Sequence, residues 1–361
     1  MKYNLSDISD YLEGDYVIAQ RHPTLPLLIY NYSRTTQFSG IWDDITLNCR
    51  GLVLDLEGNV IAKPFPKFFN YEEHTAENSK LPPIPNESFE VYEKMDGSLG
   101  IFFYYGGEWH MATRGSFTSE QAIKGMEMMK KYNFEKLHTD YTYLFEIIYN
   151  ENRIVCNYNF EDIVLLGIIN TKTGNEVNLN NDTEDIRIKN IISNIGFRIV
   201  TLYKTWGEDW ETLKKEISKD NEGYVIRFSG GMRMKIKGDE YVRLHRILTN
   251  FSTKDIWELL KNGEPLEPFL DRVPDEFDAW VKEVVRDLQT RYDSILNDYQ
   301  TILFNIWHPD KKLFAEYAKR YPHPSLLFSM YDNKKNKCGY DYIWKLLKPK
   351  YEKPFKKDEN N

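Results

Sequence analysis

The chain has 361 residues, of which 41% are hydrophobic and 15% aromatic, and its formal net charge is −8 at pH 7. This length supports two domains with sizeable cores. The acidic balance excludes a general nucleic-acid coat protein, because neutralising phosphates requires Lys and Arg. An enzyme with a local basic groove remains compatible with it.

The three cysteines, Cys49, Cys156 and Cys338, are far apart and form no Cys-x-x-Cys pair. This pattern indicates a reducing compartment and argues against a structural zinc site. No apolar run approaches the ~20 residues of a membrane span, and the first residues lack the apolar core of a signal peptide. The sequence therefore predicts a cytoplasmic protein without a membrane segment.

The first 250 or so residues are expected to form short strands mixed with a few helices. Runs rich in Val, Ile, Phe and Tyr and bounded by Gly, Asn and Asp predict strands at 27–32, 51–56, 59–63, 143–148, 163–170, 223–228 and 232–237. Helical spacing and capping residues predict helices at 119–132, 182–195 and 209–218. This mixture predicts an α+β domain of mostly antiparallel sheets flanked by helices.

The remainder of the chain has helical periodicity. Ser252 can cap a helix, and apolar residues at spacings of three and four predict a long amphipathic helix over 278–307. From Lys311 onward, Lys and Arg exceed Asp and Glu by seven. We predict a first domain at 1–248 and an all-helical second domain at 249–361.

Residues 93–98 read Glu-Lys-Met-Asp-Gly-Ser and lie between two strand-like runs, 89–92 and 99–105. A lysine at a strand end, followed by a glycine that allows a ligand to approach the backbone closely, can serve as a nucleophile. The plain alternative is a β-hairpin with Asp-Gly at its turn. The pattern alone does not decide between these interpretations.

Five further stretches place charged residues within or beside segments that are predicted to be strands or turns. These residues are Arg50 before a strand, Lys67 beside two aromatics, Glu146 in an apolar run, Glu222 at a strand start, and Lys235 with Lys237 on one strand face. Each one alone could be an ordinary surface residue or lie on the solvent-exposed face of a strand. Together they supply the cations and carboxylates that would bind a nucleoside triphosphate with its metal and support attack on the α-phosphate.

In this order the motifs resemble the covalent nucleotidyltransferase superfamily of ATP-dependent RNA and DNA ligases and mRNA-capping guanylyltransferases. The closest resemblance is to the bacteriophage RNA ligase 1 family, which repairs broken tRNA anticodon loops. Further matching stretches are 48–51, 67–70, 113–116, 119–122, 152–155 and 235–245. The resemblance covers about residues 27–250 and implies that the first domain is an adenylation domain.

The resemblance implies that Lys94 attacks the α-phosphate of ATP and becomes a lysyl–AMP adduct. AMP then passes to an RNA 5′-phosphate, and a 3′-hydroxyl displaces it to form a phosphodiester. The implied ATP-binding residues are Tyr30, Arg50, Lys67, Phe69, Glu93, Glu146, Lys235 and Lys237. Further essential candidates are Asp96, Gly97, Arg114, Glu222 and Tyr241.

The implied cofactors are ATP and Mg²⁺, or Mn²⁺ in its place. Glu222 would act on the metal through water, and no complete ligand set is assigned. In the helical domain a carboxylate such as Glu264 or Glu267 could hold a metal. Arg114 stands where the closest relatives have lysine, so a planar guanidinium with several donors replaces a compact ammonium group.

The implied partner is single-stranded or nicked RNA, foremost tRNA, with the helical domain as a tRNA-selecting module and the protein as a monomer. One alternative is a non-catalytic module that binds nucleotide or RNA ends. Another is a DNA ligase or capping-type enzyme. Those enzymes carry a small β-barrel after the paired lysines, and the helical pattern here disfavours them.

Overall fold

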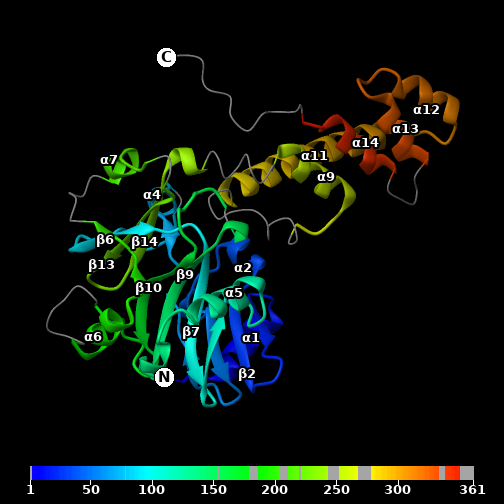
Figure 1. Cartoon of the computed structure of the whole chain (residues 1–361). Coiled ribbons are helices and arrows are strands. Elements are labelled where there is room, and N and C mark those ends of the chain that lie inside the picture. The colour runs from blue at the N-terminus through cyan, green and yellow to red at the C-terminus, as the bar shows by residue number, and fades with distance from the viewer. Residues whose placement is uncertain are drawn as a thin grey trace. The chain divides into compact units, whose positions relative to one another are not determined.

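The structure is a computed structural model that describes residues 2–77, 79–152, 154–178, 186–203, 210–218, 221–242, 252–266, 278–332 and 338–349. The chain divides into two compact units, Met1–His245 and Arg246–Asn361 (Figure 1). The boundary predicted between residues 248 and 249 falls within 243–251, outside the described residues.

An antiparallel sheet of four strands opens the first unit, in the order β1-β2-β3-β4. Its strands are β1 (Val17–Arg21), β2 (Leu27–Tyr32), β3 (Arg50–Asp55) and β4 (Val60–Ala62), and its helices are α1 (Leu5–Glu13), α2 (Arg34–Ser39) and α3 (Asp44–Asn48). Alternating side chains give this sheet two apolar faces. One packs on α1 through Ile8, and the other packs on the second sheet through Leu27 and Ile29.

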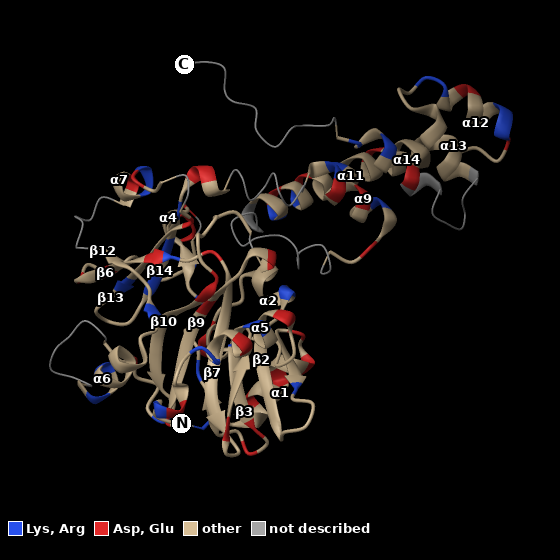
Figure 2. Ribbon diagram, in the orientation of Figure 1, with Lys and Arg blue, Asp and Glu red and all other residues tan. Residues whose placement is uncertain are grey.

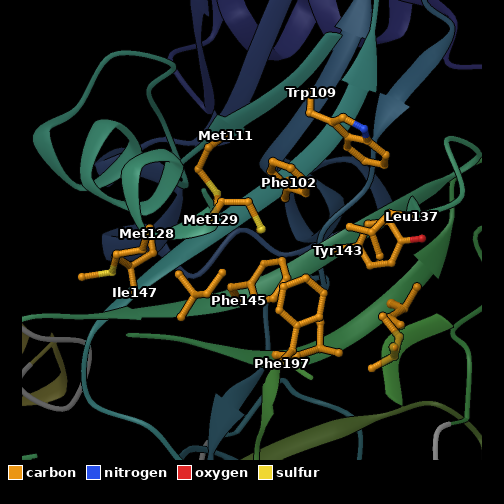
Figure 3. Close-up of a cluster of buried hydrophobic side chains, with 14 of the residues drawn as sticks. Phe102, Trp109, Met111, Met128, Met129, Leu137, Tyr143, Phe145, Ile147 and Phe197 are labelled. Atoms are coloured by element: carbon orange, nitrogen blue, oxygen red, sulfur yellow. The ribbon is translucent and has the colours of Figure 1, made fainter. Parts of the chain in front are cut away.

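The second sheet has five strands in the order β11-β10-β9-β7-β8. They are β7 (Ser98–Tyr105), β8 (Glu108–Ala112), β9 (Tyr141–Ile148), β10 (Asp162–Asn170) and β11 (Arg198–Ile199). Helices α5 (Glu120–Met129) and α6 (Ile186–Ile195) cover one face, where Phe102, Phe145 and Phe197 belong to one buried cluster (Figure 3). Two 3-10 turns, Phe134–Lys136 and Asn150–Asn152, flank β9.

The third sheet carries most of the charged candidates and has the order β12-β6-β13-β14-β5. Its strands are β5 (Phe69–Asn70), β6 (Phe89–Lys94), β12 (Leu202–Tyr203), β13 (Gly223–Phe228) and β14 (Arg233–Lys237), and α4 (Tyr71–Thr75) and α7 (Trp210–Lys215) accompany them. Val91, Ile226 and Ile236 share its apolar face with Leu213 of α7. The opposite face is therefore available for charged side chains.

The nucleophile motif does not form a β-hairpin. Strand β6 ends at Lys94 in the third sheet, and β7 begins at Ser98 in the second sheet. The hairpin alternative is thus wrong, because the turn at Asp96–Gly97 carries the chain from one sheet to another. The seven predicted strands are confirmed with ends shifted by two residues or fewer, and the predicted helix at 119–132 appears as α5 with Ser119 as its N-cap.

In the second unit, every element within the described residues is a helix. These are α9 (Thr253–Asn262), α11 (Asp278–Ile306), α12 (Lys311–Ala318), α13 (Pro324–Asp332) and α14 (Cys338–Leu346) (Figure 1). The Trp257 indole donates a hydrogen bond of 2.8 Å to the Trp344 carbonyl, and Tyr292 stacks on Trp344. The predicted fold class, an α+β domain followed by a helical one, is confirmed.

No helix in the described part of the chain combines the length and the hydropathy that crossing a membrane requires.

Candidate active site

Strand register places the predicted nucleophile beside the paired lysines. Gly223 of β13 lies opposite Lys94 of β6 on one side and opposite Lys237 of β14 on the other. A side chain at Gly223 has no space, because a Cβ there would lie 2.0 Å from the Ile236 carbonyl oxygen, at a φ of 150°. Glycine therefore allows the three strands to close at this point, and Glu222 directly before it lies between the two lysines.

Glu222 forms an ion pair with each of these lysines. Lys94 Nζ donates to Glu222 Oε2 at 2.8 Å, and Lys237 Nζ lies 2.7 Å from Glu222 Oε1. The Glu222 side chain is 4% exposed and that of Lys94 is 20% exposed. A buried carboxylate that bridges two ammonium groups satisfies charges that burial would otherwise make costly. Lys94 is the more accessible of the two lysines, since the Lys237 side chain is 10% exposed.

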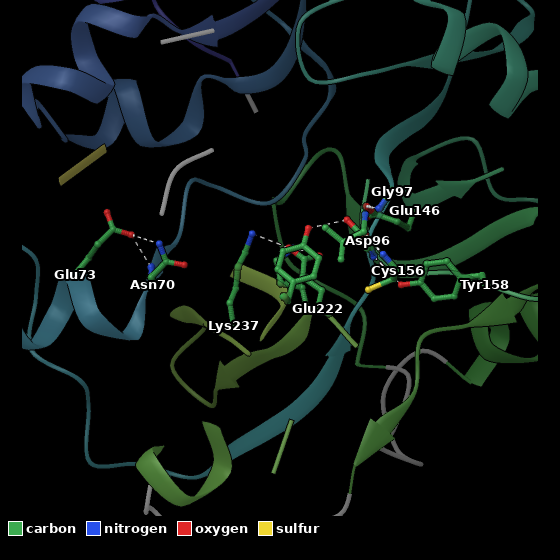
Figure 4. A network of polar contacts seen from close by, with 12 residues as sticks. Asn70, Glu73, Asp96, Gly97, Glu146, Cys156, Tyr158, Glu222 and Lys237 are labelled. Atoms are coloured by element: carbon green, nitrogen blue, oxygen red, sulfur yellow. Dashed lines mark hydrogen bonds and ion pairs between the residues drawn. The ribbon is translucent and has the colours of Figure 1, made fainter. Parts of the chain in front are cut away.

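Asp96 anchors the loop that follows Lys94 (Figure 4). Its Oδ2 accepts the backbone N–H groups of Val155 at 2.9 Å and Cys156 at 2.7 Å, and its Oδ1 accepts the Tyr241 hydroxyl at 2.8 Å. The Asp96 N–H donates to the Tyr158 hydroxyl at 2.8 Å. Four hydrogen bonds to distant parts of the chain thus fix the position of the nucleophile loop.

Glu146 of β9 supports the same loop from the second sheet. Its Oε1 accepts the Gly97 N–H at 3.0 Å, and a Cβ on Gly97 would lie 2.6 Å from the Ile147 carbonyl oxygen. Burial raises the pKa of Glu146 to about 8; Lys94 opposes this shift, and Glu222 adds to it. The carboxyl group is therefore poised to gain or lose a proton near neutral pH.

A further cation, Lys67, lies among three aromatic rings. We define the aromatic cluster as Tyr32, Trp42 and Phe69 around Lys67. Lys67 Nζ is 5.2, 5.4 and 5.5 Å from the centroids of these three rings, and it is 3.5 Å from the Tyr32 hydroxyl. Arg114 Nη1 also donates to the Tyr32 hydroxyl, at 3.2 Å. Buried ring faces stabilise a cation by their quadrupoles, so this cluster holds two positive groups close together.

Strand pairing connects the aromatic cluster to the paired lysines. Strand β5 runs parallel to β14, with Phe69 beside Met234 and Asn70 beside Lys235. Lys235 and Lys237 are 7% and 9% exposed, so the alternative of a solvated strand face is wrong for them. Because residues two apart share a strand face, both lysines face away from the apolar cluster that contains Ile236.

Three of the sequence candidates lie in other surroundings. Tyr30 is buried with Cys49 and Leu52 in the apolar cluster beneath the first sheet, where burial raises the pKa of its hydroxyl. Glu93 lies on the opposite strand face from Lys94. Burial raises the pKa of Tyr203, and the negative charge of the nearby Glu93 raises it further. The Arg50 guanidinium lies 5.4 Å from the centroid of the Phe68 ring.

Sequence reasoning missed Tyr32, Trp42 and Tyr158. Strand β2 pairs with β1 without interruption through Tyr32, and the register shift against β3 falls at Gly51. Alternation therefore groups Tyr32 with Tyr30 and does not indicate that Tyr32 contacts the cations. Trp42 lies outside the strands and helices, and Tyr158 lies in a loop. Tyr158 is 62 positions along the chain from Asp96, whose backbone N–H donates a hydrogen bond to the Tyr158 hydroxyl.

Within the described residues, no group of three or more His, Cys, Asp or Glu side chains could hold a metal ion by itself. Glu264 accepts a hydrogen bond from the Asn262 amide at 3.0 Å, and Glu267 lies outside the described residues. Arg153 of the 152–155 stretch is also outside them. A divalent cation at this site would therefore need ligands from a bound phosphate or from water in addition to Glu222.

Fold and site together define a class: an α+β domain with a strand-end lysine in a cluster of buried and half-buried charged side chains. A family profile described as RNA ligase matches residues 48–241, which include Lys94, Glu146 and Glu222, while Tyr32 and Trp42 of the aromatic cluster precede the matched range. The chain belongs to this RNA ligase family. Membership confirms the family that the sequence motifs predict.

Two curated relatives are similar in sequence. A protein of Autographa californica nuclear polyhedrosis virus, provisionally named as a bifunctional polynucleotide kinase/RNA ligase, is 28% identical over 61% of this chain and 34% of its own length. An RNA ligase of Rhodothermus phage RM378 is 25% identical over 74% of this chain and 75% of its own length. The chain thus spans only about a third of the viral protein.

Among solved structures, a protein of Aquifex aeolicus provisionally named as an ATP-dependent DNA ligase covers 95% of this chain and 97% of its own. Its TM-score is 0.45 and its sequence identity is 13%.

Proposed function

We propose that this protein is an ATP-dependent RNA ligase that joins 5′-phosphate and 3′-hydroxyl RNA ends. The observation that carries the proposal is the position of Lys94 at a strand end, with its Nζ 2.8 Å from a buried glutamate that also binds Lys237. Family membership supplies the RNA substrate class.

The residues fit a nucleoside triphosphate. Lys67, Lys235 and Lys237 are each less than 10% exposed, and buried cations in one neighbourhood suit phosphate oxygens. Lys67 and Arg114 would bind phosphates on the aromatic side, and Lys235 and Lys237 would meet the α-phosphate. Glu146 would contact the ribose, as the resemblance implies, and a divalent cation near Glu222 would supply charge neutralisation for the phosphates.

The proposed reaction has three balanced steps. The neutral Lys94 amine attacks the α-phosphorus of ATP, the bond to the β-phosphate oxygen breaks, and pyrophosphate and a proton leave. An oxygen of an RNA 5′-phosphate then attacks the same phosphorus, and the lysine nitrogen departs and regains a proton. Finally an RNA 3′-hydroxyl attacks the activated 5′-phosphate, loses its proton and releases AMP.

The Asp96 contacts suggest how this chain would assist. Both Asp96 oxygens are occupied by hydrogen bonds, so the carboxylate holds the loop and leaves proton transfer to other groups. Tyr241 also lies against Lys237, whose Nζ is 5.1 Å from the ring centroid. Tyr241 would thereby keep the nucleophile loop and the lysine strand in one arrangement through successive steps.

The physiological substrate that we propose is a nicked tRNA, and we propose that the helical unit helps to select it. A cytoplasmic monomer is part of the same proposal. These finer points rest on the sequence resemblance.

The test is incubation with magnesium and either ATP or GTP labelled at the α-phosphate, followed by denaturing electrophoresis. We expect a covalent band with ATP, no band with GTP and no band in Lys94→Ala, while the circular dichroism spectrum of the variant stays native. Labelling of Lys94→Ala would refute the lysine assignment. A band with GTP would indicate capping chemistry, and no band with either nucleotide would favour a binding module.

A further inference from the structure

Four large apolar side chains are exposed where α11 ends and α12 follows. Phe304 is 86% exposed, Trp307 53%, Leu313 39% and Tyr317 41%. We call these four residues the aromatic patch. Isolated exposed apolar residues are common, but three aromatic rings within fourteen positions are a concentration that indicates an interaction site.

Helix geometry pairs two members of the patch. Leu313 and Tyr317 are four positions apart on α12 and so share a helix face, whereas Phe304 lies in the last turn of α11 and Trp307 directly follows that helix. The scaffold beneath is well packed. Phe314 stacks on Tyr331 at 4.1 Å between ring centroids, and the Tyr331 hydroxyl donates to the His308 carbonyl at 2.9 Å.

Basic residues flank the aromatic patch. Lys311, Lys312, Lys319 and Arg320 are all exposed, whereas residues 307–320 contain only two acidic residues. Figure 2 shows basic segments at α12 in a chain whose net charge is −8. The Arg320 guanidinium lies 5.2 Å from the Tyr317 ring centroid, so cation and ring are already adjacent.

We propose that the aromatic patch binds unpaired bases of an RNA, with Lys312, Lys319 and Arg320 neutralising its phosphates. Exposed rings stack on bases of any sequence, and nearby cations track the backbone. Protein interfaces, by contrast, are depleted in lysine, so this composition favours RNA over a protein partner. The proposal rests on the proposed function, because it names a surface that would hold the ligase's RNA substrate.

The test uses the full chain and a fluorescein-labelled, unstructured oligoribonucleotide without a 5′-phosphate, titrated in the absence of ATP. We expect the double variant Phe304→Ala/Trp307→Ala to weaken binding by about tenfold or more. We expect the triple variant Lys312→Gln/Lys319→Gln/Arg320→Gln to weaken binding and to reduce the slope of log affinity against log salt by about 2.

The control variants remove exposed apolar or basic side chains from other parts of the chain. Ile123→Ala removes an apolar side chain that is 55% exposed in the first unit. The triple variant Lys254→Gln/Arg291→Gln/Lys345→Gln removes three exposed charges from other helices of the second unit. All variants should label with AMP like the unaltered chain, which shows that they are folded.

RNA affinity and salt dependence unchanged by the patch variants, or changed equally by the controls, would overturn the proposal. A patch variant that alters the molar mass in light scattering without altering RNA affinity would show instead a contact between copies of this chain, and would also overturn it. Failure of the unaltered chain to form a covalent AMP adduct would refute the proposed ligase reaction, and the RNA titration would still decide the role of the patch.

Discussion

Two regions of the site hold lysines in different ways. Lys94 and Lys237 share one carboxylate, Glu222, at 2.8 and 2.7 Å. Lys67 lies among the rings of Tyr32, Trp42 and Phe69 at more than 5 Å from each centroid. An ion pair compensates charge strongly and at short range, whereas ring faces compensate it weakly.

This difference suggests different tasks. Glu222 fixes Lys94 and Lys237 relative to one another through two short ion pairs, so we expect this group to set the geometry of the proposed nucleophile in advance. The aromatic cluster brings Lys67 and Arg114 to one hydroxyl, that of Tyr32, so we expect it to act mainly in binding phosphates. Removing a member of the first region should impair both the fold and the reaction, and removing a member of the second should impair nucleotide affinity.

The largest effect is expected from Glu222→Gln. This change leaves Lys94 and Lys237 without their shared anion, so the rate of lysyl–AMP formation should fall by about 100-fold or more, and the free energy of unfolding should fall by about 1–3 kcal/mol. Single-turnover labelling and urea denaturation measure the two quantities. The control is Glu72→Gln, which breaks an exposed pair with Lys214 and should change neither noticeably. Labelling within tenfold of the unaltered rate would contradict the central place of Glu222.

The next effect is that of Lys67→Met, which keeps the apolar stem and removes the charge. The KM for ATP should rise by about tenfold, the value of one charge-assisted contact. Because the rings compensate the cation by only about 1 kcal/mol, thermal stability should drop less than in Glu222→Gln. Lys254→Met on the surface of α9 is the control. A larger loss of stability than in Glu222→Gln would reverse the distinction between the two regions.

The pH dependence of stability offers a third test, at Glu146. Its folded pKa of about 8 lies above the ordinary value of 4.5, so between these pH values the folded chain holds a proton that the unfolded chain has released. Stability from this group is therefore lost as the pH rises from 4.5 toward 8. Relative to the unaltered protein, Glu146→Gln should gain about 1–3 kcal/mol between pH 5 and pH 8. Urea titrations at the two pH values measure this gain, and a constant difference between the proteins would rule out the raised pKa.

The smallest effect is expected from Tyr32→Phe. Loss of the hydroxyl removes one acceptor shared by Lys67 and Arg114 and keeps the ring, so the KM for ATP should rise by only about 2–5-fold. Tyr132→Phe, which removes a hydroxyl bound to Asp162 at 2.8 Å, should leave the KM unchanged. If both variants raise the KM equally, the Tyr32 hydroxyl has no specific part in the nucleotide site.

Much of the local structure follows from side-chain pattern alone. The predicted strands at 27–32 and 223–228 agree with β2 and β13 to the residue, and the predicted helix at 278–307 agrees with α11 to one residue. Strands β1 and β8 were missed; in β1 only Val17 is buried, so its composition gives little signal. The roles assigned to single residues stay predictions.

The sequence by itself determined many of the strands and helices and most of the charged residues that gather in the site, because these depend on periodicity and composition. Only the tertiary structure decided which of them touch. Asp96 and Tyr241 are 145 positions apart and yet share a hydrogen bond. The Tyr32 hydroxyl likewise meets Lys67 and Arg114, which come from distant parts of the chain. Long-range contacts of this kind arise from how the sheets pack together, which local side-chain periodicity does not encode.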